Sequence, residues 1–257
     1  MSSSYPHKAP PEGWMPLLAR CWDFLTEGGY TAIVIGSQAL SLHLLKLSER
    51  EKGRLDWRVA FPSKDLDISV PALEREGEFN QEFLRDFSGF VRGLEGLAYK
   101  GTQTLDLKAE ERGLVAYVFV RLPSGKPFTI ELSSTIIGMR PYVFVVRDSK
   151  VRLAPVGREF LALSPVDAVL VRLASPAPIE LKHVERLRAF IHALNVKPED
   201  VADRLHEVLK PDMVEHLYHN LRRMEGYGIH PWGRDAWRRF LALIGLKPMG
   251  HGHDSPA

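Results

Sequence analysis

Three carboxylates stand in segments with strand periodicity, and their spacing suits work on a phosphate group. Asp65 and Asp67 alternate with apolar residues in a segment that we predict to be a strand over 65–70. Because side chains two apart on a strand share a face, both carboxylates should project together. Two hard oxygen donors on one face suit Mg²⁺, which also takes substrate phosphates as ligands. Glu131, in a later strand-like segment, adds a third carboxylate that could act as general base or as ligand of a second metal.

A Gly-Ser pair directly follows the apolar, β-branched run 30–35, which we predict to be a buried strand. Gly36 and Ser37 break that run, and helical periodicity resumes over 38–47. A turn that enters a helix leaves backbone N–H groups unpaired at the positive end of the helix, which favours an anionic phosphate. Gly-Ser turns and Asp-Leu-Asp segments are each common, so the interpretation rests on their combination and order.

The other segments predict an α/β region followed by helices only. Apolar spacing indicates further helices over 14–26 and 79–91 and an antiparallel set of strands over 102–107, 114–122 and 128–132. A hairpin is expected from 142–146 and 151–154. From about residue 160 only helices are expected, over 164–174, 180–194, 198–209, 211–225 and 234–244, several of which begin at Pro.

The predicted fold is therefore an α/β (α+β) mixed sheet flanked by helices and followed by an all-α domain. We expect a flexible arm over 1–12, the α/β domain over 13–160, the helical domain over 161–247 and a disordered tail over 248–257. The polar stretch 48–64 is interpreted as an insertion.

Composition indicates an ordinary globular protein, with 45% hydrophobic and 26% charged residues. Cys21 is the single cysteine, which excludes an internal disulfide and favours a reducing cytoplasm. The N-terminal stretch lacks the apolar centre of a signal peptide, and no apolar run approaches the roughly 18 residues of a membrane span. We expect a cytoplasmic protein with no membrane partner. A net charge of +2 does not by itself indicate nucleic-acid binding.

In this order, the Gly-Ser turn, the Asp-x-Asp strand and the later strand carboxylate resemble the DNA polymerase β-type nucleotidyltransferase superfamily. The likeness is to its stand-alone group that includes the AbiEii-type toxins of toxin–antitoxin systems, which join such a domain to a helical C-terminal domain. The segment 163–174 resembles the first helix after their catalytic domain. Arg172 stands where those proteins carry a basic residue, usually Lys, that reaches the triphosphate. The segment 199–205 resembles their later helical segment, which we interpret as structural.

This resemblance implies that a nucleoside monophosphate is transferred from an NTP to a hydroxyl, with two Mg²⁺ ions that Mn²⁺ could replace. Asp65 and Asp67 would bind both ions, and Glu131 would bind the catalytic ion and help to deprotonate the acceptor. The acceptor would be RNA such as tRNA, or a protein, and an antitoxin would be a further partner.

The resemblance also implies a nucleotide-binding role for residues around these carboxylates. Gly36 and Ser37 would hold the β- and γ-phosphates, and Lys64 and Arg172 would supply positive charge. Without the resemblance, Arg172 would be interpreted as a surface or intrahelical ion-pair residue.

Two features depart from the family pattern. The interval from Ser37 to Asp65 is longer than usual, and the third carboxylate is Glu131 where Asp is commoner. Both favour an alternative: a catalytically inactive protein of this fold that acts as a nucleotide-binding or partner-binding module. The spacing from Arg186 to His192 loosely resembles a motif of helical ribonucleases, and we attribute it to chance.

Basic and aromatic residues alternate near the end of the helical half, a pattern found in proteins that bind RNA. The residues are Arg222, Arg223, Tyr227, Trp232, Arg234, Trp237, Arg238 and Arg239. We interpret the tryptophans as core residues and leave the role of the arginines open.

Overall fold

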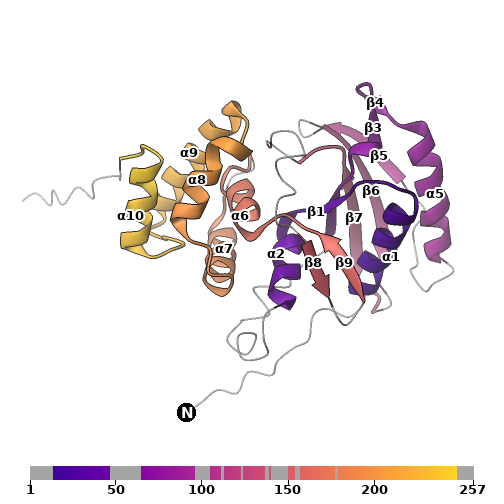
Figure 1. Ribbon diagram of the computed structural model, residues 1–257, viewed down its shortest axis with the longest axis horizontal. Coiled ribbons are helices and arrows are strands. Elements are labelled where there is room, and N and C mark those ends of the chain that lie inside the picture. The colour runs from indigo at the N-terminus through magenta and orange to yellow at the C-terminus, as the bar shows by residue number, and fades with distance from the viewer. Residues whose placement is uncertain are drawn as a thin grey trace, which may run out of the picture.

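The computed structural model describes residues 14–46, 65–95, 105–110, 113–122, 124–136, 139, 150–153, 157–176 and 179–247. Figure 1 shows an α/β half that contains a mixed sheet and, beside it, a half made of helices. The strands are β1 (Ile33–Val34), β2 (Asp65–Ser69), β3 (Glu74–Arg75), β4 (Glu78–Phe79), β5 (Leu105–Glu110), β6 (Gly113–Arg121), β7 (Pro127–Ser133), β8 (Lys150–Leu153) and β9 (Arg158–Leu161). The helices are α1 (Trp14–Glu27), α2 (Gly36–Leu45), the short 3₁₀ helix η1 (Pro71–Leu73), α5 (Gln81–Glu95), α6 (Pro165–Leu173), α7 (Leu181–Ala193), α8 (Pro198–Val208), α9 (Pro211–Gly226) and α10 (Arg234–Leu243). The predicted fold class, a mixed sheet flanked by helices and followed by helices, is confirmed.

The main sheet has the strand order β1-β2-β7-β6-β5. β2 and β7 run parallel, whereas the other neighbouring pairs run antiparallel. The predicted antiparallel set β5–β6–β7 is confirmed. Along β2 and β7 buried apolar residues alternate with more exposed polar residues. This alternation gives the sheet one apolar face and one polar face, as expected for a sheet that is covered by helices on one side.

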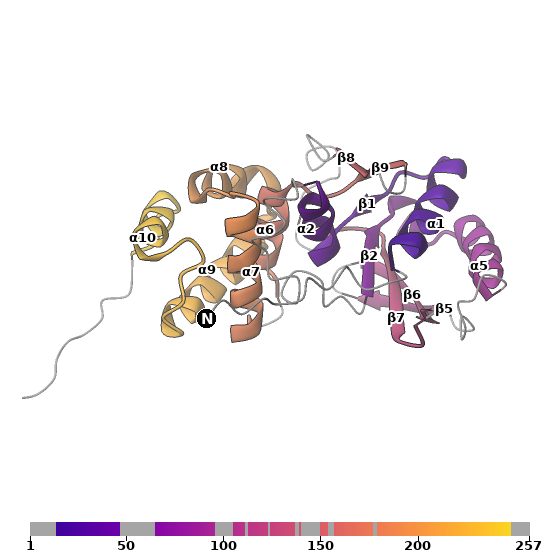
Figure 2. The same cartoon turned by 90° about the horizontal axis from the view of Figure 1, so that it is seen from below.

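The apolar face packs against α1 and α5, which lie together on one side of the sheet (Figure 2). The two helices meet through aromatic rings: Phe24 of α1 stacks on Phe90 of α5 with 4.8 Å between centroids and also contacts Phe83 and Phe87. Burial of such rings accounts for much of the stability of a domain of this size. Because this side of the sheet is filled, the chemistry-bearing side chains are confined to the other face.

The helical half is joined to the α/β half through α2 and α6, which pack against each other. The imidazole Nε2 of His43 on α2 lies 2.9 Å from the backbone oxygen of Leu163, just before α6. The Leu163 N–H in turn donates to the Val34 oxygen at the end of β1. These bonds fix the start of α6 against the edge of the sheet.

Within the helical half, a buried carboxylate joins two helices. Asp167, in the first turn of α6, is 1% exposed and accepts two hydrogen bonds from Arg204 of α8, at 3.0 and 3.1 Å. Its backbone N–H donates to the Ser164 hydroxyl, which caps α6 as the Ser-Pro pair predicts. The geometry pairs a nearly fully buried charge with a two-pronged donor, as such a charge requires.

β8 pairs with β9, over Arg158–Leu161, a strand that the sequence analysis did not predict. The predicted hairpin of 151–154 with 142–146 stays a prediction. Residues 142–146 lie outside the described residues, as do Lys64, the expected insertion 48–64, the arm 1–12 and the tail 248–257. After Leu161 every described element is a helix. None of the helices in the described part of the chain is long and apolar enough to span a membrane.

Candidate functional site

The pairing of β2 with β7 brings the predicted carboxylates together on the polar face of the sheet. Asp67 lies directly opposite Glu131 in the parallel register, and Asp65 lies opposite Thr129 one step along the same face. Asp65 is exposed, while Asp67 and Glu131 are half-buried. Strands that pair lie about 4.8 Å apart, so the Asp67 and Glu131 side chains leave the backbone as immediate neighbours. The structure therefore places these three predicted residues on one surface.

Gly36 lies against this surface, at the first position of α2. Its φ is +63°, a conformation that L side chains rarely adopt. A Cβ atom added there would collide with the Asp67 carboxylate and lie 3.1 Å from Gln38 Oε1. Both the backbone conformation and the close approach of Asp67 thus require glycine at this position. The backbone also joins the two elements directly, because the Ile35 N–H donates to the Asp67 oxygen at 3.0 Å.

The first turn of α2 has neither a side-chain cap nor an acidic residue. The residue before the helix, Ile35, makes no side-chain hydrogen bond to it. Ser37 is half-buried at the second position of the helix. The helix begins at Gly36 itself, two residues earlier than the sequence indicated. Helix N-terminal N–H groups and a serine hydroxyl beside the carboxylates form an arrangement that suits an anionic ligand.

Gln38 is a site residue that the sequence analysis missed. It is 1% exposed, and its side-chain amide donates to the backbone oxygen of Asp65 and, at 3.0 Å, to Asp65 Oδ1. The amide therefore holds the start of β2 against α2 and orients one predicted metal ligand. Its place in the first turn, two residues after Gly36, was the available signal, because a first-turn side chain can reach back over the helix start.

Two arginines of the helical half carry positive charge to these carboxylates. Arg172, in the last turn of α6, is half-buried: burial lowers its pKa, and the negative charges of Asp67 and then Glu180 raise it. Arg186 of α7 is also half-buried: burial and the charge of Arg172 lower its pKa, while Asp65 and Asp67 raise it. Arg172 therefore lies where a cation was predicted. Arg186 is a second residue that the sequence analysis did not assign to the site.

The carboxylate oxygens of this surface are of the type that Mg²⁺ prefers, although the described residues do not form a complete metal site. Asp65, Asp67 and Glu131 offer carboxylate oxygens, the ligand type that Mg²⁺ prefers. Among the residues that the structure describes, however, no group of three or more His, Cys, Asp or Glu side chains is arranged so that it could hold a metal ion. The three carboxylates share a face, and Asp65 is engaged by Gln38. Metal binding by this set stays a prediction.

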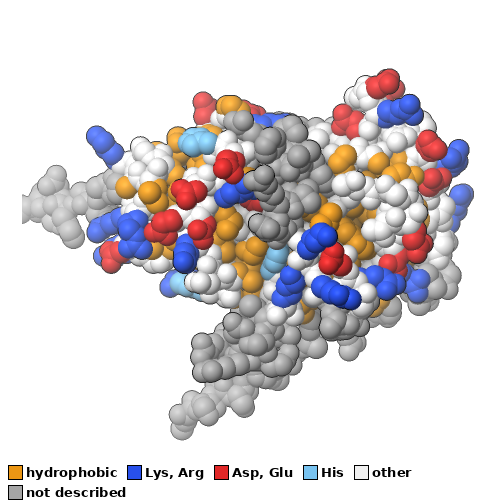
Figure 3. All heavy atoms as spheres, in the orientation of Figure 1, with side chains coloured by type: hydrophobic (Ala, Val, Ile, Leu, Met, Phe, Trp, Pro, Cys, Tyr) orange, Lys and Arg blue, Asp and Glu red, His pale blue; other side chains and the backbone are white. Residues whose placement is uncertain are grey.

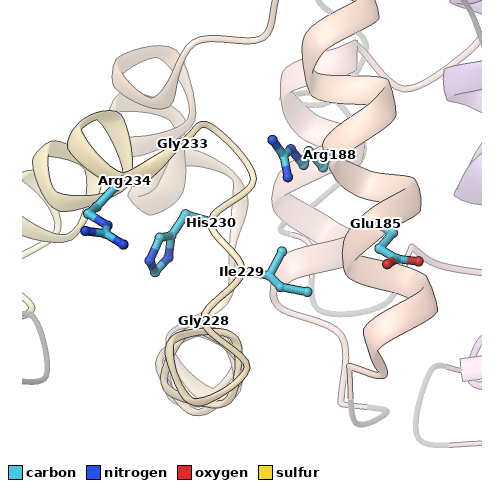
Figure 4. A pocket seen from close by; sticks show the side chains of 7 residues that line it. All are labelled: Glu185, Arg188, Gly228, Ile229, His230, Gly233 and Arg234. Atoms are coloured by element: carbon cyan, nitrogen blue, oxygen red, sulfur yellow. The ribbon is translucent and has the colours of Figure 1, made fainter. Parts of the chain in front are cut away.

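A separate cavity of about 490 Å³ lies within the helical half, away from the carboxylates (Figure 4). Arg188 and Glu185 of α7 line one side, and His230 and Arg234 line the opposite side. The helical period turns Arg188 about 160° and Glu185 about 100° away from Arg186 around the axis of α7. The cavity therefore does not continue the carboxylate surface.

The basic end of the helical half is also distant from the carboxylates. Arg234, Arg238 and Arg239 are exposed on α10, and blue side chains gather at that end in Figure 3. In Figure 1, α10 lies at the end of the molecule farthest from the sheet. Trp237 is 1% exposed, and the Trp232 indole donates to the Val196 oxygen at 2.8 Å. The interpretation of both tryptophans as packing residues is confirmed.

Comparison with known proteins adds distant likenesses in shape. No protein-family model matches this sequence, and no curated protein matches it. One similar solved structure is the solution structure of the antibiotic-resistance factor ANT(2'')-Ia, with 12% identity and a TM-score of 0.46, over 83% of this chain and 97% of that one. Another is the crystal structure of an antigenic nucleotidyltransferase-like protein from Paracoccidioides brasiliensis, with 10% identity and a TM-score of 0.42, over 81% and 94%. Likenesses this distant assign no function, so a function has to be argued from the residues of the site.

Proposed function

We propose that this protein is a metal-dependent nucleotidyltransferase that moves a nucleoside monophosphate from an NTP to a hydroxyl acceptor. The observation that carries the proposal is the register of β2 with β7, which sets Asp67 beside Glu131 and Asp65 on the same face. Carboxylates alone would repel a polyphosphate. Here the N-terminus of α2 and the half-buried Arg172 provide positive potential next to them.

Each group has a distinct role in this proposal. Asp65, Asp67 and Glu131 would hold Mg²⁺, which when bound offsets the negative charge of the phosphates. The N–H groups at Gly36 and Ser37 and the Arg172 guanidinium would hold the outer phosphates. The acceptor oxygen forms its bond to the α-phosphorus as the bond from that phosphorus to the bridging oxygen breaks, so that pyrophosphate leaves. The acceptor proton passes to Glu131.

The test is a transfer assay with each α-labelled NTP, Mg²⁺, total cellular RNA and cell lysate. With the wild type we expect label in one acceptor class. With Asp67→Asn we expect the transfer rate to fall by about 100-fold or more, because this carboxylate would hold the metal ion that offsets the charge of the phosphates. Asp86→Asn is the matched control. Asp86 lies on α5, which packs on the other face of the sheet. The Asp86 carboxylate accepts a hydrogen bond from the Tyr30 hydroxyl. Equal transfer by the wild type and Asp67→Asn would refute the assignment of the site.

A second candidate is supported by a specific observation. Asp65 is engaged by Gln38, and the described carboxylates do not converge on a metal position. These features favour a nucleotide-binding or partner-binding module without chemistry. Nucleotide binding in a titration, with no label transferred to RNA or protein, would select this candidate. The acceptor, whether RNA such as tRNA or a protein, and a toxin–antitoxin role are further proposals that derive from the family resemblance.

A further inference from the structure

Arg186 is buried in a way that costs free energy unless it serves a ligand. Its Nε and Nη2 atoms are shielded from solvent and have no hydrogen-bond partner among the described residues. The guanidinium carbon lies 5.6 Å from the centroid of the Phe190 ring, so the cation rests on an aromatic face that satisfies none of its N–H groups. A buried donor without an acceptor costs about 1–3 kcal/mol, and more when it is charged.

His183 lies one helical turn before Arg186 on α7 and shares its face. Its Nδ1 atom is likewise buried without a partner in the part of the chain that the structure describes. Burial first, and then the charge of Arg172, lower the pKa of His183, so its imidazole is neutral near pH 7. The charge of Arg172 lowers the pKa of both Arg186 and His183, so the three groups lie near one another where α6 and α7 pack together.

Two guanidinium groups and an imidazole would not be placed together by packing alone, because the arginines repel each other. The carboxylates Asp65 and Asp67 partly offset that repulsion through their charge. They leave the Nε and Nη2 atoms of Arg186 without acceptors in the described part of the chain, however. A compact anion with several oxygens that reached both arginines at once would supply such acceptors.

We propose that Arg186, together with Arg172 and His183, forms an oligophosphate-binding subsite that the helical half supplies to the carboxylate site. This inference deepens the proposed function, since the oligophosphate would be the outer phosphates of the nucleotide. Arg186 is the specificity-determining member, because its Nε and Nη2 atoms have no acceptor among the described residues. Linked phosphates offer more oxygens to two guanidinium groups than a single phosphate does. Binding by this subsite requires no transfer chemistry.

The test uses calorimetric titration of the full chain with inorganic tripolyphosphate in EDTA, so that neither metal nor base contributes. We expect Arg186→Gln to weaken tripolyphosphate binding about 10- to 100-fold, the scale of lost charge-assisted hydrogen bonds. Arg188→Gln is the matched control, because it makes the same change two residues further on the opposite face of α7. Inorganic monophosphate should distinguish the wild type from Arg186→Gln much less than tripolyphosphate does.

A melting curve of each unliganded variant separates ligand binding from a structural role. If Arg186 serves a ligand, Arg186→Gln should melt at or above the wild-type temperature, because unpaired buried donors are removed. Arg186→Lys, which keeps the charge but loses the fork of donors, should bind with intermediate affinity. The inference is overturned if the wild type does not bind tripolyphosphate, if Arg186→Gln binds it as tightly as the wild type, or if Arg188→Gln loses as much. An Arg186-dependent affinity in a protein that transfers no label would keep this subsite and refute the transferase.

Discussion

Replacement of Gly36 by alanine tests whether the N-terminus of α2 is shaped around the Asp67 carboxylate. Two effects are expected: a loss of folding free energy and a displacement of the Asp67 side chain. The first is conformational: with φ at +63°, an L side chain costs about 1–2 kcal/mol of folding free energy. The second is local, because the new methyl group would collide with the Asp67 carboxylate and lie 3.1 Å from Gln38 Oε1. Asp67 would have to move away from the site.

Gly29→Ala is the matched control for this experiment. Gly29 has a similar φ of +73°, but a Cβ atom there would meet nothing within 4 Å. Both variants should therefore lose about 1–2 kcal/mol in urea unfolding followed by circular dichroism. Only Gly36→Ala should also lose transfer, by about 100-fold, since displacing a reacting group by about 1 Å has effects of that size.

The comparison of the two variants decides the question. If Gly36→Ala transfers label as well as Gly29→Ala does, the contact between Gly36 and Asp67 has no bearing on function. If Gly36→Ala loses much more stability than Gly29→Ala and also fails to bind nucleotide, the contact serves the fold. A loss of transfer with equal stability in both variants would show that Asp67 acts from the position in which the structure places it.

Two further predictions follow from buried titratable groups. Burial raises the pKa of Cys21 to about 12, and the residue is 2% exposed. Thiol reagents at mildly alkaline pH should therefore modify it about 1000-fold more slowly in the native protein than in denaturing guanidinium. Equal rates of modification would contradict its burial. Burial lowers the pKa of His43 below its ordinary 6.5, so as the pH falls the unfolded chain takes up this proton before the folded protein does. The free energy of unfolding should therefore be highest above about pH 6.5 and fall as the pH drops towards 5. His43→Gln, which keeps a donor for the Leu163 oxygen but does not titrate, should show a shallower fall, although His183 adds a shift of the same sign. An unchanged pH slope in His43→Gln would exclude a contribution from this histidine.

The sequence predicted the local elements of the site because each has a local cause. Alternation along Asp65–Ser69 and helical spacing after Gly36 depend on neighbouring residues only, and both elements are present. The pairing of Asp67 with Glu131 has no such cause. Those residues are 64 positions apart, and their adjacency depends on the parallel register of β2 and β7, which the whole sheet determines.

The missed residues also have a physical explanation. Gln38 and Arg186 are each one polar side chain within a helix, where the usual interpretation is a solvated position. Their roles depend on residues that are distant in the sequence. Gln38 donates a hydrogen bond to Asp65, and Arg186 lies close enough to Asp65 and Asp67 for their charges to raise its pKa. The strand Arg158–Leu161 was missed because half of its short sequence is charged, and its partner β8 supplies the burial that the sequence pattern lacked.

The charges of the site come from different halves of the chain, and this has a consequence for how the site forms. At this surface β2 and β7 contribute the carboxylates Asp65, Asp67 and Glu131, which repel one another and repel phosphate. The described cations that offset them are on α6 and α7, which reach the sheet through the packing of α6 on α2 and the bond between His43 and Leu163. Without α6 and α7, the described part of the α/β half would keep the N-terminus of α2 as its source of positive potential beside the carboxylates. In the proposed site the helical half supplies both described guanidinium groups, so a polyphosphate should bind more weakly to the α/β half alone.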